Sequence, residues 1–184
     1  MNGSALHHDA LTLLHGWRAP SAEQDDVRRR YLTHLEVEEH GLRRECFPAH
    51  ITASTLIVSP DGRRVLLTLH AKAKAWFQMG GHCEEQDTTL AGAALREAVE
   101  ESGLAGLTLD PSPVQLDAHE VAFCDPRGTV CHLDVRFLAV APKSGTSATS
   151  EESLDVAWWP VDALPTKEAS LLELVELARQ QLDA

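Results

Sequence analysis

The chain has 184 residues, of which 43% are hydrophobic, and a formal net charge of −12 at pH 7. This length suits a single domain with a substantial core. The acidic charge disfavours a protein that holds nucleic acid by counterion release, because that mode of binding needs a basic face. A small anionic ligand is still compatible with this charge if local cations or a bound metal offset it.

The sequence has no feature of a membrane or secreted protein. No stretch approaches the roughly 20 uninterrupted apolar residues that a membrane-spanning helix needs. The first ten residues contain two histidines and an aspartate, where a signal peptide would have basic residues followed by an apolar run. We therefore expect a cytoplasmic protein without a membrane partner. Its four cysteines are then expected to be reduced.

Two of these cysteines lie near a histidine, which raises the question of a zinc site. Cys124, Cys131 and His132 are close in sequence, but two of them are adjacent and no fourth ligand stands at a usual spacing. This pattern favours buried strand residues over a metal centre.

The first 45 residues predict helices. Ser21 followed by Gln24 is a capping-box pattern, and apolar residues recur at roughly helical spacing from Ala22 to about Leu42. A shorter helix is expected from Ala10 to Trp17. Neither segment is long enough to have its own core. We therefore interpret this region as a helical N-terminal extension packed on the rest of the chain.

From Ile51 the pattern changes to strands and turns. Thr52–Ser59 and Arg64–Leu69 flank a Pro-Asp-Gly turn and predict a hairpin. Further strands are expected at 114–123, 129–141 and 155–159, and an amphipathic helix at 167–182. Strands interrupted by one central helix and closed by another predict an α/β layered domain, which we place at residues 46–184.

The central helix has recognisable ends and two different faces. Thr88 or Asp87 can cap its start, and Gly103 suits a left-handed C-terminal cap. At about 100° per residue, Glu97, Glu100 and Glu101 gather on one side of the helix. The opposite, apolar side is expected to face the core and consists of Ala91, Ala94, Leu95, Ala98 and Val99.

The three glutamates admit two interpretations. Like charges at these spacings destabilise a helix by a few tenths of a kcal/mol per pair, so something should compensate. A solvated acidic face is the common interpretation of a bare Glu-x-x-Glu-Glu pattern. The alternative is a platform for Mg²⁺, which prefers oxygen ligands and is often completed by substrate phosphates. The pair Gly80 and Gly81 upstream would let backbone approach a metal or a phosphate closely.

The stretch from Gly81 to Leu104 resembles the Nudix box, G-x5-E-x7-R-E-U-x-E-E-x-G-U, where U is a bulky aliphatic residue. Three departures are visible. Asp87 stands where the family has Glu, eight residues instead of seven separate it from Arg96, and Ala98 is a small residue at U. Glu84 or Glu85 could take the place of Asp87. The residues that match are Gly81, Arg96, Glu97, Glu100, Glu101, Gly103 and Leu104.

The resemblance implies an α/β/α sandwich with a mixed sheet. It also implies hydrolysis of a nucleoside diphosphate linked to another moiety, with Mg²⁺ or Mn²⁺ as cofactor. Glu97, Glu100 and Glu101 would hold the metal with the Gly81 carbonyl, and Arg96 would pair with a box carboxylate to orient it. By family habit the protein would form a homodimer.

Other roles are less specified by the sequence. The general base would be Glu100, or else Glu151 or Glu152 in a polar loop. Lys72 and Trp76 could meet a phosphate or stack on a base. His82, His119, His132 and Asp134 are weaker candidates for the pocket, and the identity of the diphosphate is not encoded in a readable way. Two other functions remain open, namely a nucleotide-binding sensor module and an isoprenoid diphosphate isomerase on the same fold.

Overall fold

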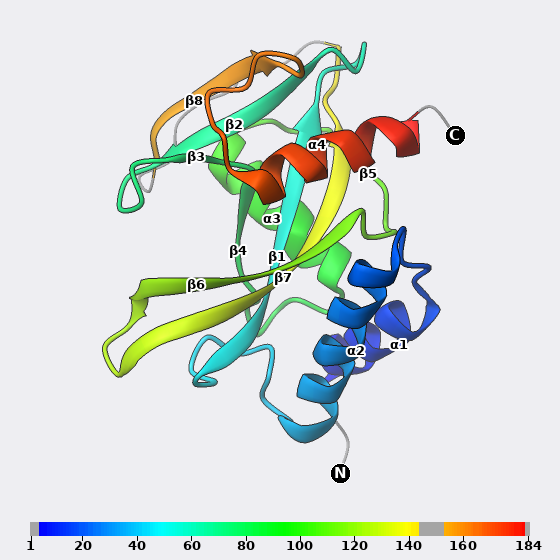
Figure 1. Ribbon diagram of the computed structural model, residues 1–184, viewed down its shortest axis with the longest axis vertical. Helices are drawn as coiled ribbons and strands as arrows, with labels where there is room; N and C mark the ends of the chain where they lie inside the picture. The colour runs from blue at the N-terminus through cyan, green and yellow to red at the C-terminus, as the bar shows by residue number, and fades with distance from the viewer. Residues whose placement is uncertain (1–3, 144–152, 183–184) are drawn as a thin grey trace.

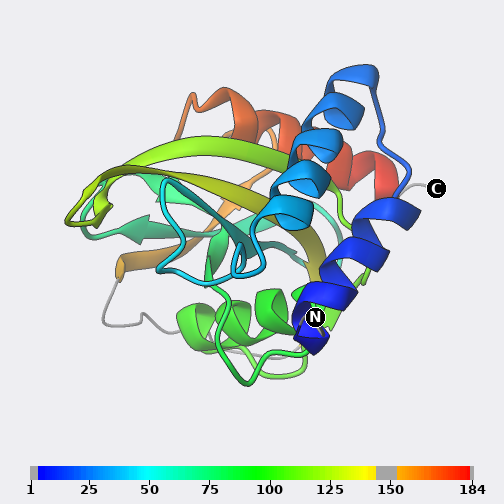
Figure 2. The same ribbon diagram turned by 90° about the horizontal axis from the view of Figure 1, so that it is seen from below.

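The computed structural model describes residues 4–143 and 153–182. In this part of the chain a mixed sheet of eight strands lies between helices on its two faces, as Figure 1 and Figure 2 show. The predicted α/β/α sandwich is confirmed. The helices are α1 (Ala5–Gly16), α2 (Ala22–Val37), α3 (Leu90–Ser102) and α4 (Ala169–Leu182). The strands are β1 (Ala49–Val58), β2 (Arg64–His70), β3 (Trp76–Phe77), β4 (Met79–His82), β5 (Thr108–Leu109), β6 (Gln115–Asp125), β7 (Gly128–Val140) and β8 (Ser153–Pro160).

Strand β1 forms the centre of the sheet. It pairs antiparallel with β2 near its end and with β4 nearer its start, and it pairs parallel with β7 along its whole length. Strand β6 lies on the far side of β7, and β8 on the far side of β2. Strands that are distant in sequence therefore lie side by side at the start of β1.

Alternation along β1 gives the sheet two different faces. Ile51 and Ala53 lie in one apolar core with residues of α3, and Thr55 donates a hydrogen bond to the Ala94 carbonyl of that helix. Leu56 lies on the opposite face, in a second core that includes residues of α4. The two helices thus cover opposite faces of the sheet, as Figure 2 shows.

The N-terminal helices are tied to the sheet by buried hydrogen bonds. The Tyr31 hydroxyl donates to the Asp134 carbonyl at 3.3 Å, and the Trp17 indole donates to the Pro113 carbonyl at 2.6 Å. Ser21 accepts the Gln24 amide, as the capping pattern predicts, but the Gln24 side chain turns into the core and bonds the backbone of Leu116 twice. The division into an extension and a domain at residue 46 stays a prediction.

Several predicted boundaries shift. Helix α1 begins at Ala5 because Ser4 caps it. Helix α2 ends at Val37 instead of Leu42, since the chain turns back around Gly41, whose amide bonds the Glu38 carbonyl. Strand β4 was not expected, because its Gly-Gly pair disfavours a strand in isolation. None of the described helices is long and apolar enough to cross a membrane.

Helix α3 is rotated slightly from its expected orientation. Thr89 caps its start, one residue later than predicted, and Gly103 ends it with φ of 68°, as expected for a left-handed cap. The buried residues of the helix are Leu90, Ala93, Ala94, Ala98 and Ser102. Val99 is 37% exposed, so its assignment to the core is wrong. The rotation turns two of the glutamates towards β4.

Candidate active site

Strand β4 brings the glycine pair against the acidic face of α3. A Cβ atom on Gly81 would lie 2.7 Å from the Glu97 Oε2, so a side chain at this position would displace the Glu97 carboxylate. The Gly80 amide donates a hydrogen bond of 2.8 Å to the Glu101 carboxylate. Two of the glutamates thus lie directly beside the glycine backbone, which explains why β4 tolerates residues that are otherwise poor in strands.

Arg96 is the cation that compensates the glutamates. Its guanidinium bonds both oxygens of Asp87, at 3.2 and 2.9 Å, and it also donates to Glu97 at 2.9 Å and to Glu100 at 3.1 Å. A further bond of 3.0 Å reaches the His82 carbonyl at the end of β4. One side chain therefore joins the loop before α3, the helix and the strand. Such charge-assisted bonds also fix the orientation of the carboxylates.

Burial and charge shift the acidity of these groups. Burial raises the pKa of Glu97, against the effect of Arg96, and the neighbouring Glu100 raises it further. Burial alone would also raise the pKa of Asp87, but hydrogen bonds from Arg96 and from the Glu84 amide hold it below its ordinary value. Two carboxyl groups that share one arginine therefore titrate in opposite directions from their ordinary values.

The alternatives to Asp87 lie further from the centre of this network. Glu84 approaches Arg96 only to 3.7 Å, and its side chain is half exposed. Glu85 pairs instead with Arg43, at 3.4 Å on the surface. Among the three acidic residues that the sequence offered, Asp87 is the one with a bidentate contact to Arg96.

The remaining predicted residues are scattered. Lys72 lies with its ammonium 5.9 Å from the centre of the Phe123 ring, and Trp76 packs edge-on against Trp159 beside the core that α4 covers. Neither belongs to the hydrogen-bond network around Arg96. Glu151 and Glu152 lie outside the described residues. Their part in catalysis stays a prediction.

The opposite face of the sheet carries a buried polar network. Asp134 on β7 accepts hydrogen bonds from Thr52 at 3.0 Å and Ser54 at 2.7 Å on β1. It also pairs with Arg136 at 3.0 Å, and this arginine pairs with Asp117 on β6 at 2.7 Å. Buried charges require such pairing. The sequence pointed to Asp134 alone, because the members of this network come from three strands.

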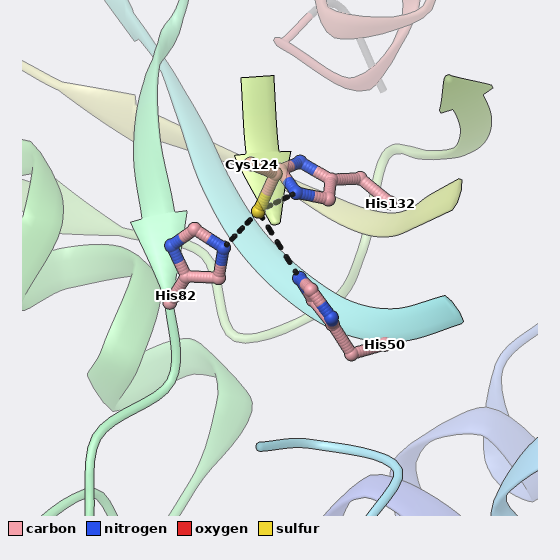
Figure 3. A group of neighbouring side chains, drawn as sticks. All are labelled: His50, His82, Cys124 and His132. Atoms are coloured by element: carbon pink, nitrogen blue, oxygen red, sulfur yellow. Dashed lines mark hydrogen bonds between the residues drawn. The ribbon is translucent and has the colours of Figure 1, made fainter. Parts of the chain in front are cut away.

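Four further side chains meet next to this network: His50, His82, Cys124 and His132. Figure 3 shows these four side chains together. Burial and the neighbouring imidazoles lower the pKa of both His82 and His132 to about 3. The rings are thus neutral at physiological pH. His50 was not predicted from the sequence, because none of the other three residues lies near it in the chain. Cys131, which the sequence placed near Cys124 and His132, does not belong to the group.

The family of the chain follows from a comparison with known domain families. The model for the NUDIX domain matches residues 48–178. The chain belongs to the Nudix family. The matched segment includes the glycine pair, Arg96 and all three glutamates, so the resemblance based on these residues is confirmed at the level of the family. Family membership supports a hydrolase. A comparison with curated proteins yields no match.

Solved structures of Nudix proteins share the fold. A Nudix hydrolase from Clostridium perfringens is 25% identical, with a TM-score of 0.55, and the similarity covers 72% of this chain and 97% of that one. The dihydroneopterin triphosphate pyrophosphohydrolase of E. coli is 22% identical, with a TM-score of 0.60 and coverage of 73% and 96%. The Nudix domain of NrtR from Shewanella oneidensis, solved with ADP-ribose, is 21% identical, with a TM-score of 0.55 and coverage of 72% and 87%.

Proposed function

We propose that this Nudix protein hydrolyses the pyrophosphate bond of a nucleoside diphosphate linked to another moiety, with Mg²⁺ or Mn²⁺ as cofactor. The observation that carries the proposal is the close approach of the Gly80–Gly81 backbone to Glu97 and Glu101. This approach places the carboxylates of Glu97 and Glu101 against the backbone of β4. Oxygen donors of this kind are the ligands that Mg²⁺ prefers.

The donor set fits a divalent cation. Glu97, Glu100 and Glu101, together with the Gly81 carbonyl, would hold it. Once bound, the ion would offset the charge of the diphosphate and activate a water molecule. The Cβ clash at Gly81 is consistent with this assignment, because a side chain there would occupy the space beside the Glu97 carboxylate.

The residues around the cation have separate tasks. Arg96 orients Glu97 and Glu100 through its hydrogen bonds. Asp87 takes the place of the first glutamate of the box, because it fixes Arg96 through both of its oxygens. Glu100 is the best candidate for the general base among the described residues, since its side chain is 58% exposed and can reach a solvent molecule. Glu151 and Glu152 remain the alternatives.

The substrate class is supported by the ligands of similar proteins. The E. coli structure is a pyrophosphohydrolase, and the Shewanella domain was solved with ADP-ribose, which is a nucleoside diphosphate joined to a sugar. Lys72 would contact a phosphate and Trp76 a base. A cytoplasmic location and a homodimer are parts of the same proposal.

A nucleotide-binding module is the second candidate. Asp87 is one methylene shorter than the glutamate of the box, and the Shewanella domain is described with a bound ligand and not by a reaction. In such a module the acidic site would bind a nucleotide without turning it over.

Product analysis by chromatography tests the proposal. The purified protein is incubated with Mg²⁺ or Mn²⁺ and nucleotide sugars, dinucleoside polyphosphates, ADP-ribose, NADH, nucleoside triphosphates and isopentenyl diphosphate. Metal-dependent release of phosphate-containing fragments, lost in Glu100→Gln and kept in the distant Glu176→Gln, supports hydrolysis. Tight binding of an unchanged nucleotide would instead support the module, and an isomerised product would support the isomerase.

A further inference from the structure

A group of side chains of the types that bind metals lies on the face of β4 opposite the glutamates. His50, His82, Cys124 and His132 come from β1, β4, β6 and β7, and their donor atoms all lie within 4.8 Å of one another. The Cys124 Sγ is 3.3 Å from His132 Nε2, 3.4 Å from His82 Nε2 and 4.0 Å from His50 Nε2. In Figure 3 the three rings surround the sulfur.

The sheet register builds this group. His50 lies directly beside His132 in the parallel β1–β7 ladder. His82 lies beside Thr52 on the neighbouring antiparallel strand, and Thr52 shares a face with His50 because the two are two residues apart. The pairing register of β6 with β7 shifts between Val121 and Asp125, and such irregularities change the direction in which side chains point. Cys124 lies within this shift.

The hydrogen bond of His50 prepares its ring for a metal. The Nδ1 atom lies 3.0 Å from the Cys46 carbonyl, which can only accept, so Nδ1 carries the hydrogen. The Nε2 atom therefore presents a lone pair to the centre of the group. Histidines that bind metals commonly hold their second nitrogen in this way, which fixes both the tautomer and the ring orientation.

The four donor atoms, which lie within 4.8 Å of one another, are spread somewhat more widely than the ligands of a tetrahedral zinc site. Zinc binds nitrogen at about 2.0–2.1 Å and sulfur at about 2.3 Å, so tetrahedral donors lie roughly 3.3–3.6 Å apart. Two of the three sulfur–nitrogen distances fall near this range, and His50 would have to move closer to the sulfur to bring in the third. A hydrogen-bonded thiol is the alternative arrangement, in which Cys124 donates its one hydrogen to His50 Nε2 and accepts from the other two rings through its sulfur, which is a weak acceptor.

We propose that His50, His82 and His132, through their Nε2 atoms, and the Cys124 thiolate form a tetrahedral Zn²⁺ site that is separate from the Mg²⁺ site. Imidazole and thiolate ligands suit zinc, whereas Mg²⁺ prefers oxygen. Four protein ligands leave no open position, as in structural sites. Binding would release the thiol proton to solvent and tie four strands together beside the loop that leads to α3.

Cobalt spectroscopy tests this site directly. Full-length protein is freed of metal with a chelator, kept in excess Mg²⁺ to occupy the carboxylates, and titrated with Co²⁺. We expect one equivalent to give the intense visible bands of tetrahedral cobalt and a thiolate-to-metal charge-transfer band, both removed by one equivalent of Zn²⁺. In Cys124→Ala the charge-transfer band is lost and zinc affinity falls at least tenfold. The matched variant Cys131→Ala removes a thiol outside the group and leaves both unchanged.

Three results would overturn the proposal. One is a weak octahedral cobalt spectrum without charge transfer in the unaltered protein. Another is identical zinc binding by Cys124→Ala and Cys131→Ala. The third is loss of the cobalt signal in Glu97→Gln but not in Cys124→Ala, which would move the ion to the carboxylates. Circular dichroism checks that each variant folds, and Cys124→Ser replaces Cys124→Ala if the latter does not. The spectrum of the unaltered protein decides the question even if both fail to fold.

Discussion

Two groups of polar side chains lie on opposite faces of β4 and differ in their donor atoms. Gly81 faces α3, where Glu97 and its neighbours supply oxygen and Arg96 balances their charge. The next residue, His82, faces the other way, where three imidazoles and a thiol supply nitrogen and sulfur. The pleat of one strand can therefore separate a site for a hard cation from a site for a softer one by a single residue.

The two groups are also connected. Arg96 donates a hydrogen bond to the carbonyl of His82, so the residue whose ring lies in one group is held through its backbone by the other. We therefore expect zinc to govern stability and magnesium to govern turnover. Variants that separate these two properties are the most informative.

The largest expected effect is on turnover in Glu100→Gln. If this residue is the general base, the loss in kcat should be about 10²–10⁴-fold, because the amide cannot accept a proton. The cobalt spectrum should not change. Steady-state kinetics at saturating Mg²⁺ measures the loss, with Glu176→Gln on α4 as the matched control. A kcat within a few-fold of the unaltered protein would exclude Glu100 as the base.

The two groups also differ in how far apart their residues lie in the sequence, and this difference decides which of them could be predicted. The residues of the acidic group lie within one stretch, from Gly80 to Glu101, so their helical spacing and the glycine pair could be recognised together. The orientation of α3 was predicted less well, because the contacts of Glu97 and Glu101 with β4 are tertiary and rotate the helix. Propensity and periodicity do not contain this information.

The histidine and cysteine group was hidden for the opposite reason. Its members lie at positions 50, 82, 124 and 132, and they meet only through the register of the sheet. The spacing rule for zinc ligands correctly describes compact motifs but does not apply to ligands from four strands. The parallel pairing of β1 with β7 was the missing fact, since it brings His50 beside His132.

Replacing Arg96 with methionine should cause the next largest effect, on stability. The substitution removes the charged partner of Asp87, whose side chain is 6% exposed, and leaves it the hydrogen bond from the Glu84 amide; breaking a buried pair costs about 3–5 kcal/mol. Urea denaturation measures the change. Arg127→Met is the control, because Arg127 is 51% exposed and its pair with Asp125 should contribute much less to stability. Equal losses in the two variants would contradict the central role of Arg96.

Metal exchange should separate stability from turnover. After chelation, we expect Mg²⁺ alone to restore hydrolysis and Zn²⁺ alone to restore the melting temperature. Zinc at about 100 times its dissociation constant should add about 2.7 kcal/mol to the free energy of unfolding, since it binds the folded chain. Thermal melts and product assays on the same samples measure both. Recovery of full stability with Mg²⁺ alone would remove the distinction between the groups.

The smallest effect is expected for His119, which lies beside the histidine and cysteine group. His119 lies 5.6 Å from His132, measured between ring centres, but its Nδ1 bonds Asp117 and its side chain is 42% exposed. The substitution His119→Ala should change the free energy of unfolding by about 0.5 kcal/mol or less, as is usual for surface positions. It should leave the cobalt charge-transfer band intact, whereas His132→Ala should weaken it. If His119→Ala abolished the band instead, His119 would be a ligand, and the site would extend along β6 towards the polar network around Asp117 and Arg136.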